Sequence, residues 1–291
     1  MSINLIQKFS TNKISIKNKK YCAILGENPS KTARSPFLWN LVLSKNNIKS
    51  EMISIDLKRK NLNKILNILE KDPDFQGGSI TIPHKEKVFD YLFKKKRVDK
   101  ITRNIGAINC IYKKNKRLFG TNTDGEAALR VFEKKFGSIK NKKCLVLGYG
   151  GVGKAVTAFF NNKLNTKIFV ANRSKIKKKK LKHNIIFIKW RDIPKNLIDK
   201  DLIINCTSIG FSKDMRSPIK SSDFSYIKKQ TIFYDVIYNP RETKFLEIAK
   251  KKFYKTKNGL EMNKVQAILA IKKVFGQKLK FSKIASTLKK V

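Results

Sequence analysis

The sequence predicts an α/β protein of two domains, and three observations support this prediction. From Tyr21 onward, short apolar runs typical of strands alternate with runs of helical periodicity. A glycine-rich turn separates one such strand from one such helix near the middle of the chain. With 291 residues, 41% of them hydrophobic, the chain is long enough to form two cores of ordinary size.

The first α/β domain is expected to span residues 1–123 and to be completed by helices within residues 262–291. Residues 1–20 are polar and basic, and we expect the start of this segment to be frayed. The pattern that follows predicts strands at 21–25, 52–57 and 79–82, a hairpin at 107–112 and 117–121, and helices at 36–44 and 62–69.

The second domain is expected to span residues 124–261 and to begin with a linking helix over residues 124–136. Apolar runs predict its strands at 144–147, 167–171, 202–204 and 232–236, and a helix continues over 154–161. Beyond Gly259 the chain becomes helical again, at about 262–274 and 281–288. We expect these last helices to pack on the first domain, which makes that domain discontinuous.

The glycine-rich turn has the sequence Gly-Tyr-Gly-Gly-Val-Gly and lies between a predicted strand and a predicted helix. Gly148 allows a tight turn, Gly150 leaves room for a pyrophosphate beside the backbone, and Gly153 lets the helix approach the sheet. The N–H groups at the helix start then face the phosphates. The turn therefore predicts a Rossmann-type domain that binds a dinucleotide through Gly148, Gly150, Gly151, Val152 and Gly153; a nucleotide-free α/β turn is the alternative.

The end of the next predicted strand indicates which dinucleotide is bound. An NAD site usually has Asp or Glu there, on the ribose hydroxyls. This chain has Asn172, Arg173 and Ser174 instead, followed by Lys175 and Lys177. A carboxylate would repel a 2′-phosphate, whereas a guanidinium and a hydroxyl would bind it. The sequence therefore predicts NADP(H) as the cofactor.

The net charge of +45, from 66 Lys and Arg against 21 Asp and Glu, raises the possibility of a nucleic acid or membrane partner. The basic residues occur on nearly every predicted element, and even the densest runs, Lys94–Arg97 and Lys177–Lys180, fit solvated surface faces. We therefore expect no specific nucleic acid partner and no membrane partner, with weak polyanion binding at low salt as a side effect.

The remaining composition fits a cytoplasmic protein. The four cysteines (Cys22, Cys110, Cys144 and Cys206) are far apart, which favours buried reduced thiols. With only His84 and His183, we expect no metal site. The sequence has no apolar run of membrane-spanning length and no signal-peptide pattern.

Two residues at predicted strand ends could transfer a proton to or from a substrate hydroxyl. Lys85 follows the short strand that precedes Pro83, and Asp124 lies where the hairpin meets the linking helix. A lysine and an aspartate at strand ends can meet at one hydroxyl, where the carboxylate orients the ammonium. Composition alone favours the simpler interpretation, in which Lys85 is one surface lysine among many and Asp124 is an ordinary helix cap.

The chain resembles shikimate dehydrogenases along nearly its whole length. The matching segments occur in the family's order and spacing: residues 28–36, 77–85, 106–109, 122–125, 148–154, 172–174, 205–210, 238–240 and 258–266. The resemblance implies reduction of 3-dehydroshikimate to shikimate with NADPH, in aromatic amino-acid and chorismate biosynthesis. It also implies a substrate-binding first domain, an NADP-binding second domain, and a monomer or homodimer.

By position, the resemblance assigns the roles of individual residues. Lys85 and Asp124 correspond to the catalytic pair. The substrate-binding residues that it implies are Ser35, Thr81, Asn109, Tyr238 and Gln266, and the cofactor-binding residues besides the glycine turn are Asn172, Arg173, Ser174, Thr207, Gly259 and Met262.

Two departures from the family pattern concern the substrate. The usual His-Ser-x-Ser-Pro segment is Thr-Ala-Arg-Ser-Pro here, so Ala33 replaces a carboxylate-binding serine, and Ser79 replaces an asparagine. Loss of a hydrogen bond to a charged group weakens binding by roughly ten- to a hundredfold. Thr32 or Arg34 could compensate. A paralogue acting on quinate, an amino-shikimate or another cyclic hydroxy acid is therefore the alternative, and a non-enzymatic basic nucleotide- or nucleic-acid-binding protein is a remote one.

Overall fold

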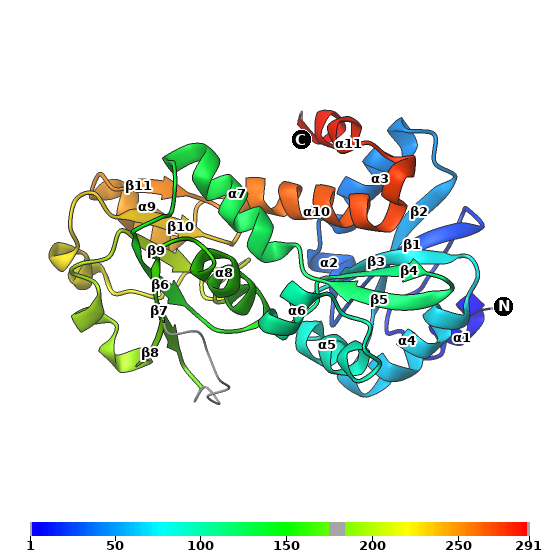
Figure 1. The fold of residues 1–291 in the computed structure, drawn as a ribbon. Coiled ribbons are helices and arrows are strands. Elements are labelled where there is room, and N and C mark those ends of the chain that lie inside the picture. Colours follow the sequence, from blue (N-terminus) through cyan, green and yellow to red (C-terminus); the bar gives the residue numbers. More distant parts are fainter. Residues whose placement is uncertain (1, 175–183, 290–291) are drawn as a thin grey trace. The chain divides into compact units, whose positions relative to one another are not determined.

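The computed structural model describes residues 2–174 and 184–289, and the contacts within it divide the chain into two compact units (Figure 1). Unit 1 comprises Met1–Thr123 and Lys264–Val291, and unit 2 comprises Asp124–Asn263. Each unit is built around one sheet.

Unit 1 contains a five-stranded mixed sheet with the order β2-β1-β3-β4-β5. β1 pairs in parallel with β2 and β3, whereas β4 is antiparallel to β3 and β5. The strands are β1 (Lys20–Gly26), β2 (Ser50–Asp56), β3 (Phe75–Ile80), β4 (Cys110–Lys114) and β5 (Arg117–Thr121). The carboxyl ends of β1, β2 and β3 therefore meet at one edge, where α/β proteins bind ligands.

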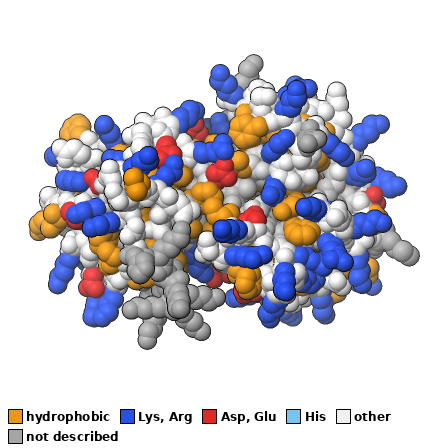
Figure 2. Space-filling model, viewed as in Figure 1, with side chains coloured by type: hydrophobic (Ala, Val, Ile, Leu, Met, Phe, Trp, Pro, Cys, Tyr) orange, Lys and Arg blue, Asp and Glu red, His pale blue; other side chains and the backbone are white. Residues whose placement is uncertain are grey.

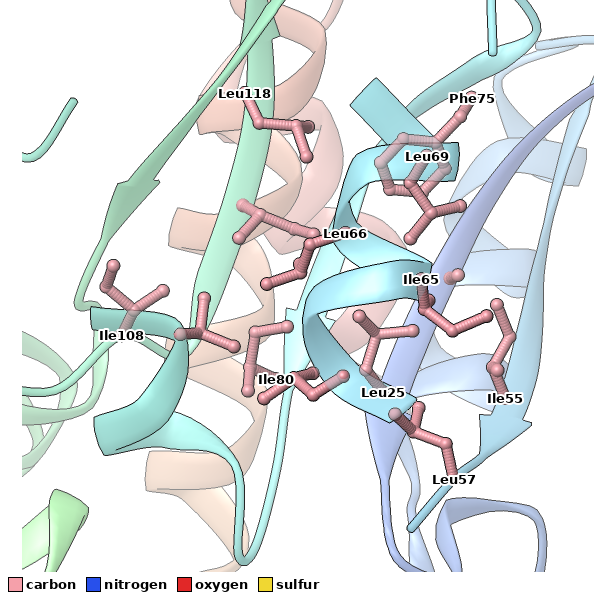
Figure 3. Packing of buried hydrophobic residues seen from close by; sticks show 14 of the residues in the cluster. Leu25, Ile55, Leu57, Ile65, Leu66, Leu69, Phe75, Ile80, Ile108 and Leu118 are labelled. Atoms are coloured by element: carbon pink, nitrogen blue, oxygen red, sulfur yellow. The ribbon is translucent and has the colours of Figure 1, made fainter. Parts of the chain in front are cut away.

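One face of this sheet is covered by an apolar layer from α4 (Leu62–Lys71). Ile65, Leu66 and Leu69 are fully buried on this helix, because their spacing places them on one side. Figure 3 shows them beside the labelled side chains of the strands, among them Leu25 and Phe75. The neighbouring helices are α5 (Lys85–Lys94) and α6 (Lys100–Ile105).

A second apolar cluster joins the two ends of the chain. It contains Trp39 from α3 (Ser35–Lys45), Ile271 from α10 (Leu260–Phe275) and Ile284 from α11 (Phe281–Lys289), all fully buried. The one-turn helix α2 (Pro29–Thr32) precedes α3. The C-terminal helices thus complete the core of unit 1.

The expectation that the chain begins with a frayed segment was wrong. Ser2–Gln7 form α1, in which Ile6 is fully buried, and Ile3 and Phe9 pack against the same core. The Asn12 side chain accepts a hydrogen bond from the last backbone N–H of β2 at 2.8 Å. The three apolar residues are spaced three apart, a helical pattern that the surrounding polar residues conceal.

The boundaries of three predicted strands also differ. The first hairpin strand, expected at 107–112, is β4 over Cys110–Lys114. β3 was expected at residues 79–82 but begins at Phe75 and ends before Thr81, and β2 begins two residues earlier than expected. The glycine pair inside β3 conceals the strand in the sequence. A side chain at Gly78 would place its Cβ 1.8 Å from the Ala23 carbonyl oxygen, so glycine is required where β3 approaches β1.

Unit 2 contains a six-stranded parallel sheet with the order β11-β10-β9-β6-β7-β8. The strands are β6 (Lys143–Leu147), β7 (Lys167–Asn172), β8 (Ile185–Lys189), β9 (Leu202–Asn205), β10 (Ile232–Asp235) and β11 (Lys255–Lys257). The helices are α7 (Asp124–Phe136), α8 (Gly151–Asn161) and α9 (Lys244–Lys251), together with the start of α10. The chain winds outward from β6 in one direction and then in the other, so the predicted Rossmann-type fold is confirmed.

The chain carries a formal net charge of +45. In the face shown by Figure 2, Lys and Arg side chains are scattered over the elements rather than gathered in one stripe. The run Lys177–Lys180 lies outside the described residues. Within the described ranges, no helix combines the length and apolar character needed to cross a membrane.

Candidate active site

In unit 1, three buried polar residues meet beyond the sheet. The Asn109 side chain donates to Thr123 Oγ1 at 2.8 Å and accepts from the Thr123 backbone N–H at 2.8 Å. Asn109 Nδ2 also lies 3.4 Å from Gln266 Oε1, and Thr123 Oγ1 donates to the Gln266 carbonyl at 3.1 Å. The structure thus brings together the predicted substrate residues Asn109 and Gln266, from opposite ends of the chain.

Lys85 begins α5, directly after the turn that follows β3. Its carbonyl oxygen accepts from the Ile108 backbone N–H at 2.9 Å, which connects the helix start to the segment carrying Asn109. The preceding turn is fixed to the sheet, because the Thr81 N–H donates to Leu25 at 2.9 Å. The Lys85 side chain is half-buried. The backbone of Lys85 is thus fixed relative to the segment carrying Asn109.

His84 was not assigned a role from the sequence, but it anchors the turn that carries Lys85. Its side chain is fully buried, and Nε2 lies 2.9 Å from the Leu57 carbonyl oxygen just beyond β2. Burial lowers the pKa of His84, which favours the neutral ring that donates from Nε2. The only sequence signal was its position next to Lys85.

Ser35 is the first residue of α3 and is buried, and α2 and the short connection after it lead into this helix. Asp56, at the end of β2, holds α2 because its carboxylate accepts from the Ser30 N–H at 2.9 Å and from the Ser30 hydroxyl. Ala33 is half-buried and packs against the apolar cluster around Trp39. The Thr32 hydroxyl donates to the Asn28 carbonyl at 2.9 Å.

In unit 2, Asp124 is the first residue of α7 and only 5% exposed. A carboxylate is favoured there by the unpaired N–H groups at the start of a helix. The helix lies close to α8, because a Cβ on Gly125 would lie 2.3 Å from the Ala155 carbonyl oxygen. Lys85 and Asp124 belong to different units.

The glycine turn has the geometry that a phosphate-binding loop requires. Gly148 has a φ of +93°, which favours glycine, and a Cβ on Gly153 would lie 2.0 Å from the Gly148 carbonyl oxygen. At Gly150, by contrast, an added Cβ would meet nothing within 4 Å. The start of α8 is therefore bordered by open space, which fits a pyrophosphate at its N–H groups.

The tip of β7 adjoins this turn. The Asn172 side chain accepts from the Tyr149 N–H at 3.0 Å and donates to the Ser174 carbonyl at 2.9 Å, so it holds the turn and the tip together. Arg173 and Ser174 are exposed. Lys175 and Lys177 lie outside the described residues. An exposed guanidinium beside the glycine turn fits recognition of a 2′-phosphate.

The remaining predicted cofactor residues follow the carboxyl ends of β9 and β11. Thr207 contacts Gly148, since a Cβ on that glycine would lie 2.8 Å from Thr207 Cγ2. Gly259 approaches β10 so closely that a Cβ would lie 2.0 Å from the Val236 carbonyl oxygen, and Met262 is buried one turn into α10. Tyr238 is half-buried, with its ring edge-on to Phe211 at 6.2 Å between centroids.

Sequence reasoning missed a buried network between these residues. Asp235 is fully buried, and its carboxylate accepts from Asn205, Thr243 and the Ile237 N–H. Asn205 in turn accepts from the N–H and the hydroxyl of Thr207. Asn205 and Asp235 are the last residues of two buried strands, β9 and β10. A polar residue at the end of each apolar run was the signal that the sequence offered for this network. Among the described residues, no group of three His, Cys, Asp or Glu could hold a metal ion.

Comparison with known proteins gives consistent matches in both units. Residues 24–111 match the family described as the shikimate dehydrogenase substrate binding domain, and residues 130–250 match the shikimate / quinate 5-dehydrogenase family. The curated shikimate dehydrogenase (NADP(+)) of Pelagibacter ubique (strain HTCC1062) is 35% identical over 252 residues, which cover 86% of this chain and 91% of that protein.

Solved structures show the same fold. A shikimate dehydrogenase from Peptoclostridium difficile superposes with a TM-score of 0.81 at 28% identity, covering 92% of this chain and 96% of its own. Another shikimate dehydrogenase, crystallised with NADP+, superposes with a TM-score of 0.79 at 27% identity, covering 95% of this chain and 96% of its own. A 5-ketofructose reductase from Gluconobacter sp. strain CHM43 gives 0.75 at 24% identity, with 94% and 99% covered, which shows the fold alone.

Proposed function

The chain belongs to the shikimate dehydrogenase family of oxidoreductases, and on this premise we propose that it reduces 3-dehydroshikimate to shikimate with NADPH. The reaction is reversible and serves the biosynthesis of chorismate and the aromatic amino acids. Lys85 and Asp124 transfer the proton, and Ser35, Thr81, Asn109, Tyr238 and Gln266 bind the substrate.

One observation carries the proposal: Lys85 begins a helix whose first carbonyl bonds to the segment carrying Asn109, and the Asn109 side chain in turn meets Gln266. Amide side chains of this kind bind hydroxyl groups as donors and acceptors at once. An ammonium beside them can recognise the carbonyl of a polyhydroxylated ring. Asn109 and Gln266 are buried, so their orientations are fixed before the substrate binds.

The chain's own residues account for the movement of the proton. NADPH, when bound, supplies the hydride that the carbonyl carbon of the substrate accepts. The Lys85 ammonium donates a hydrogen bond to the carbonyl oxygen and transfers its proton as that oxygen becomes a hydroxyl. In this proposal the Asp124 carboxylate orients the ammonium. In the reverse direction, the neutral amine of Lys85 removes the hydroxyl proton.

The residues of unit 2 fit NADP(H) rather than NAD(H). The open space at Gly150 and the N–H groups of α8 suit the pyrophosphate. Arg173 and Ser174 supply a guanidinium and a hydroxyl at the strand tip where NAD sites have a carboxylate. Related proteins named as NADP(+)-dependent support the same cofactor.

Ala33 favours a second candidate, a dehydrogenase for quinate or another cyclic hydroxy acid. Its methyl group packs toward the apolar cluster and offers no hydrogen bond to a substrate carboxylate. The 5-ketofructose reductase shows that this fold also carries reduction of a different substrate.

The test is nicotinamide absorbance with purified protein and a panel of shikimate, quinate and 3-dehydroshikimate, each with NADP(H) and NAD(H). We expect shikimate with NADP+ to give the highest kcat/KM. Turnover of quinate alone would establish the second candidate. Absence of any turnover, with tight and salt-sensitive polyanion binding, would refute both.

A further inference from the structure

We infer that Asp235 is a positioning residue for the nicotinamide cofactor, because it fixes the segment after β9 that contains Thr207 and the segment after β10 to which Gly259 is hydrogen-bonded. This inference rests on the proposed cofactor function of unit 2. Asp235 itself is fully buried, so it acts through the backbone and side chains that it holds rather than by contact with the cofactor.

The first branch of the network runs from Asp235 to Thr207. Asn205 Nδ2 lies 3.2 Å and 3.3 Å from the two carboxylate oxygens of Asp235. The side-chain Oδ1 of Asn205 is thereby turned toward Thr207, whose N–H and hydroxyl donate to it at 3.0 Å and 2.7 Å. Thr207 touches Gly148 in the glycine turn. A displaced Asp235 would therefore shift the loop beside the phosphate-binding turn.

The second branch runs from Asp235 to the start of α10. The Ile237 N–H donates to Asp235 Oδ1 at 3.0 Å, and the Ile237 carbonyl accepts from the Gly259 N–H at 2.8 Å. Gly259 in turn accepts from the Asn263 N–H at 2.8 Å, in the helical turn that contains Met262. Tyr238 directly follows Ile237. One carboxylate thus fixes the backbone around three predicted site residues.

Thr243 is the third hydrogen-bond partner of the Asp235 carboxylate. Thr243 Oγ1 donates to Asp235 Oδ2 at 2.7 Å and also caps α9, where it accepts from the Leu246 N–H at 3.4 Å. The titratable groups facing Asp235 are the Cys206 thiol and the Tyr234 phenol, and burial raises the pKa of both. Both stay neutral, so Asp235 is held by neutral donors rather than by an ion pair. A neutral amide cannot accept from all of these donors.

The amino end of the same sheet offers a matched control. Asp201, before β9, accepts from the Lys143 N–H at 2.7 Å and pairs with Lys228 at 2.6 Å. It is an aspartate with backbone and side-chain donors, like Asp235, but it lies at the opposite end of β9. Its replacement should alter stability without altering cofactor binding.

The experiment compares Asp235→Asn with Asp201→Asn by the quenching of protein fluorescence on NADPH titration, without substrate. We expect Asp235→Asn to raise the Kd for NADPH roughly tenfold, and Asp201→Asn to leave it unchanged. In the assay, KM for NADPH should rise more than KM for 3-dehydroshikimate, since Tyr238 is the one proposed substrate residue beside this network, while kcat stays near wild type. A merely structural role would lower the active fraction and kcat but leave the Kd unchanged.

An unchanged Kd in folded Asp235→Asn would overturn the inference. If that variant does not fold, Thr243→Val removes one hydrogen-bond donor to the Asp235 carboxylate. We then expect the Kd for NADPH to rise roughly threefold. An unchanged Kd in this variant would also contradict the inference. The proposed reaction is tested separately. If the wild-type protein binds NADPH but does not turn over substrate, the reaction is refuted, but the NADPH affinities of the two aspartate variants can still be compared.

Discussion

The carboxyl edges of the two sheets are built in different ways. In unit 1, side chains provide the candidate site, with Asn109, Thr123 and Gln266 bonded to one another beyond the strands. In unit 2, glycines and backbone N–H groups provide it, and Gly150 borders open space. The difference fits two tasks, because a hydroxylated ring needs specific donors and acceptors whereas a pyrophosphate needs unobstructed backbone. Substitutions in unit 1 should therefore change kcat and substrate affinity, and those in the glycine turn and the β7 tip of unit 2 should change cofactor affinity.

The largest effect is expected from Lys85→Ala in unit 1. Loss of the proton donor should lower kcat by about 10²- to 10⁴-fold, while the Kd for NADPH, measured by fluorescence, stays near wild type. Lys87→Ala is the control, since this lysine of the same helix donates to the Arg59 carbonyl at 2.9 Å and should leave kcat unchanged. Near-normal turnover of Lys85→Ala would remove this residue from the chemistry.

Arg173→Ala tests whether unit 2 recognises the 2′-phosphate of the cofactor. The guanidinium is proposed to bind the 2′-phosphate, so we expect the Kd for NADPH to rise by roughly ten- to a hundredfold and that for NADH to change little. The two affinities are measured by the same fluorescence titration. Equal losses for both cofactors would contradict the assignment of the 2′-phosphate.

Ala33→Ser restores a hydroxyl that the family pattern places before the third helix. If this chain acts on shikimate, the new hydrogen bond to the substrate carboxylate should lower KM for shikimate by up to roughly tenfold, with KM for NADP+ unchanged. Because Ala33 is half-buried against the apolar cluster, thermal unfolding of the variant is the control for misfolding. A higher KM for shikimate would instead favour a different substrate.

The smallest effect concerns pH and the buried carboxylate of unit 2. Burial raises the pKa of Asp235 from 3.8 to about 6. Between these values the folded state binds a proton that the unfolded state does not, so this group stabilises the fold increasingly as the pH falls from about 6 to about 4. The Tm of wild type minus that of Asp235→Asn should therefore rise by a few degrees on going from pH 7 to pH 5. A constant difference would show that Asp235 does not titrate in this range.

The sequence alone was sufficient for the fold class and for the glycine turn of unit 2. Local spacing determines both, because Gly148, Gly150 and Gly153 follow one strand and precede one helix. It was also sufficient for the linking helix, which runs over Asp124–Phe136 as predicted.

Other features depend on contacts between distant residues and could not be read locally. Asp235 and Asn205 are thirty residues apart and meet only because β9 and β10 are neighbours in the sheet. The burial of α1 depends on the core that strands far along the chain complete. For the proposed proton donor, Lys85, local patterns favoured an ordinary surface lysine. Only the resemblance to a family suggested its role.

The most direct test of the whole account is a crystal structure of the chain with NADP+ and shikimate bound. The account predicts the Lys85 ammonium and the Asp124 carboxylate within hydrogen-bonding distance of the same shikimate hydroxyl, on the carbon that faces the nicotinamide ring. A complex in which either side chain points away from that hydroxyl, or in which the 2′-phosphate does not contact Arg173, would contradict it.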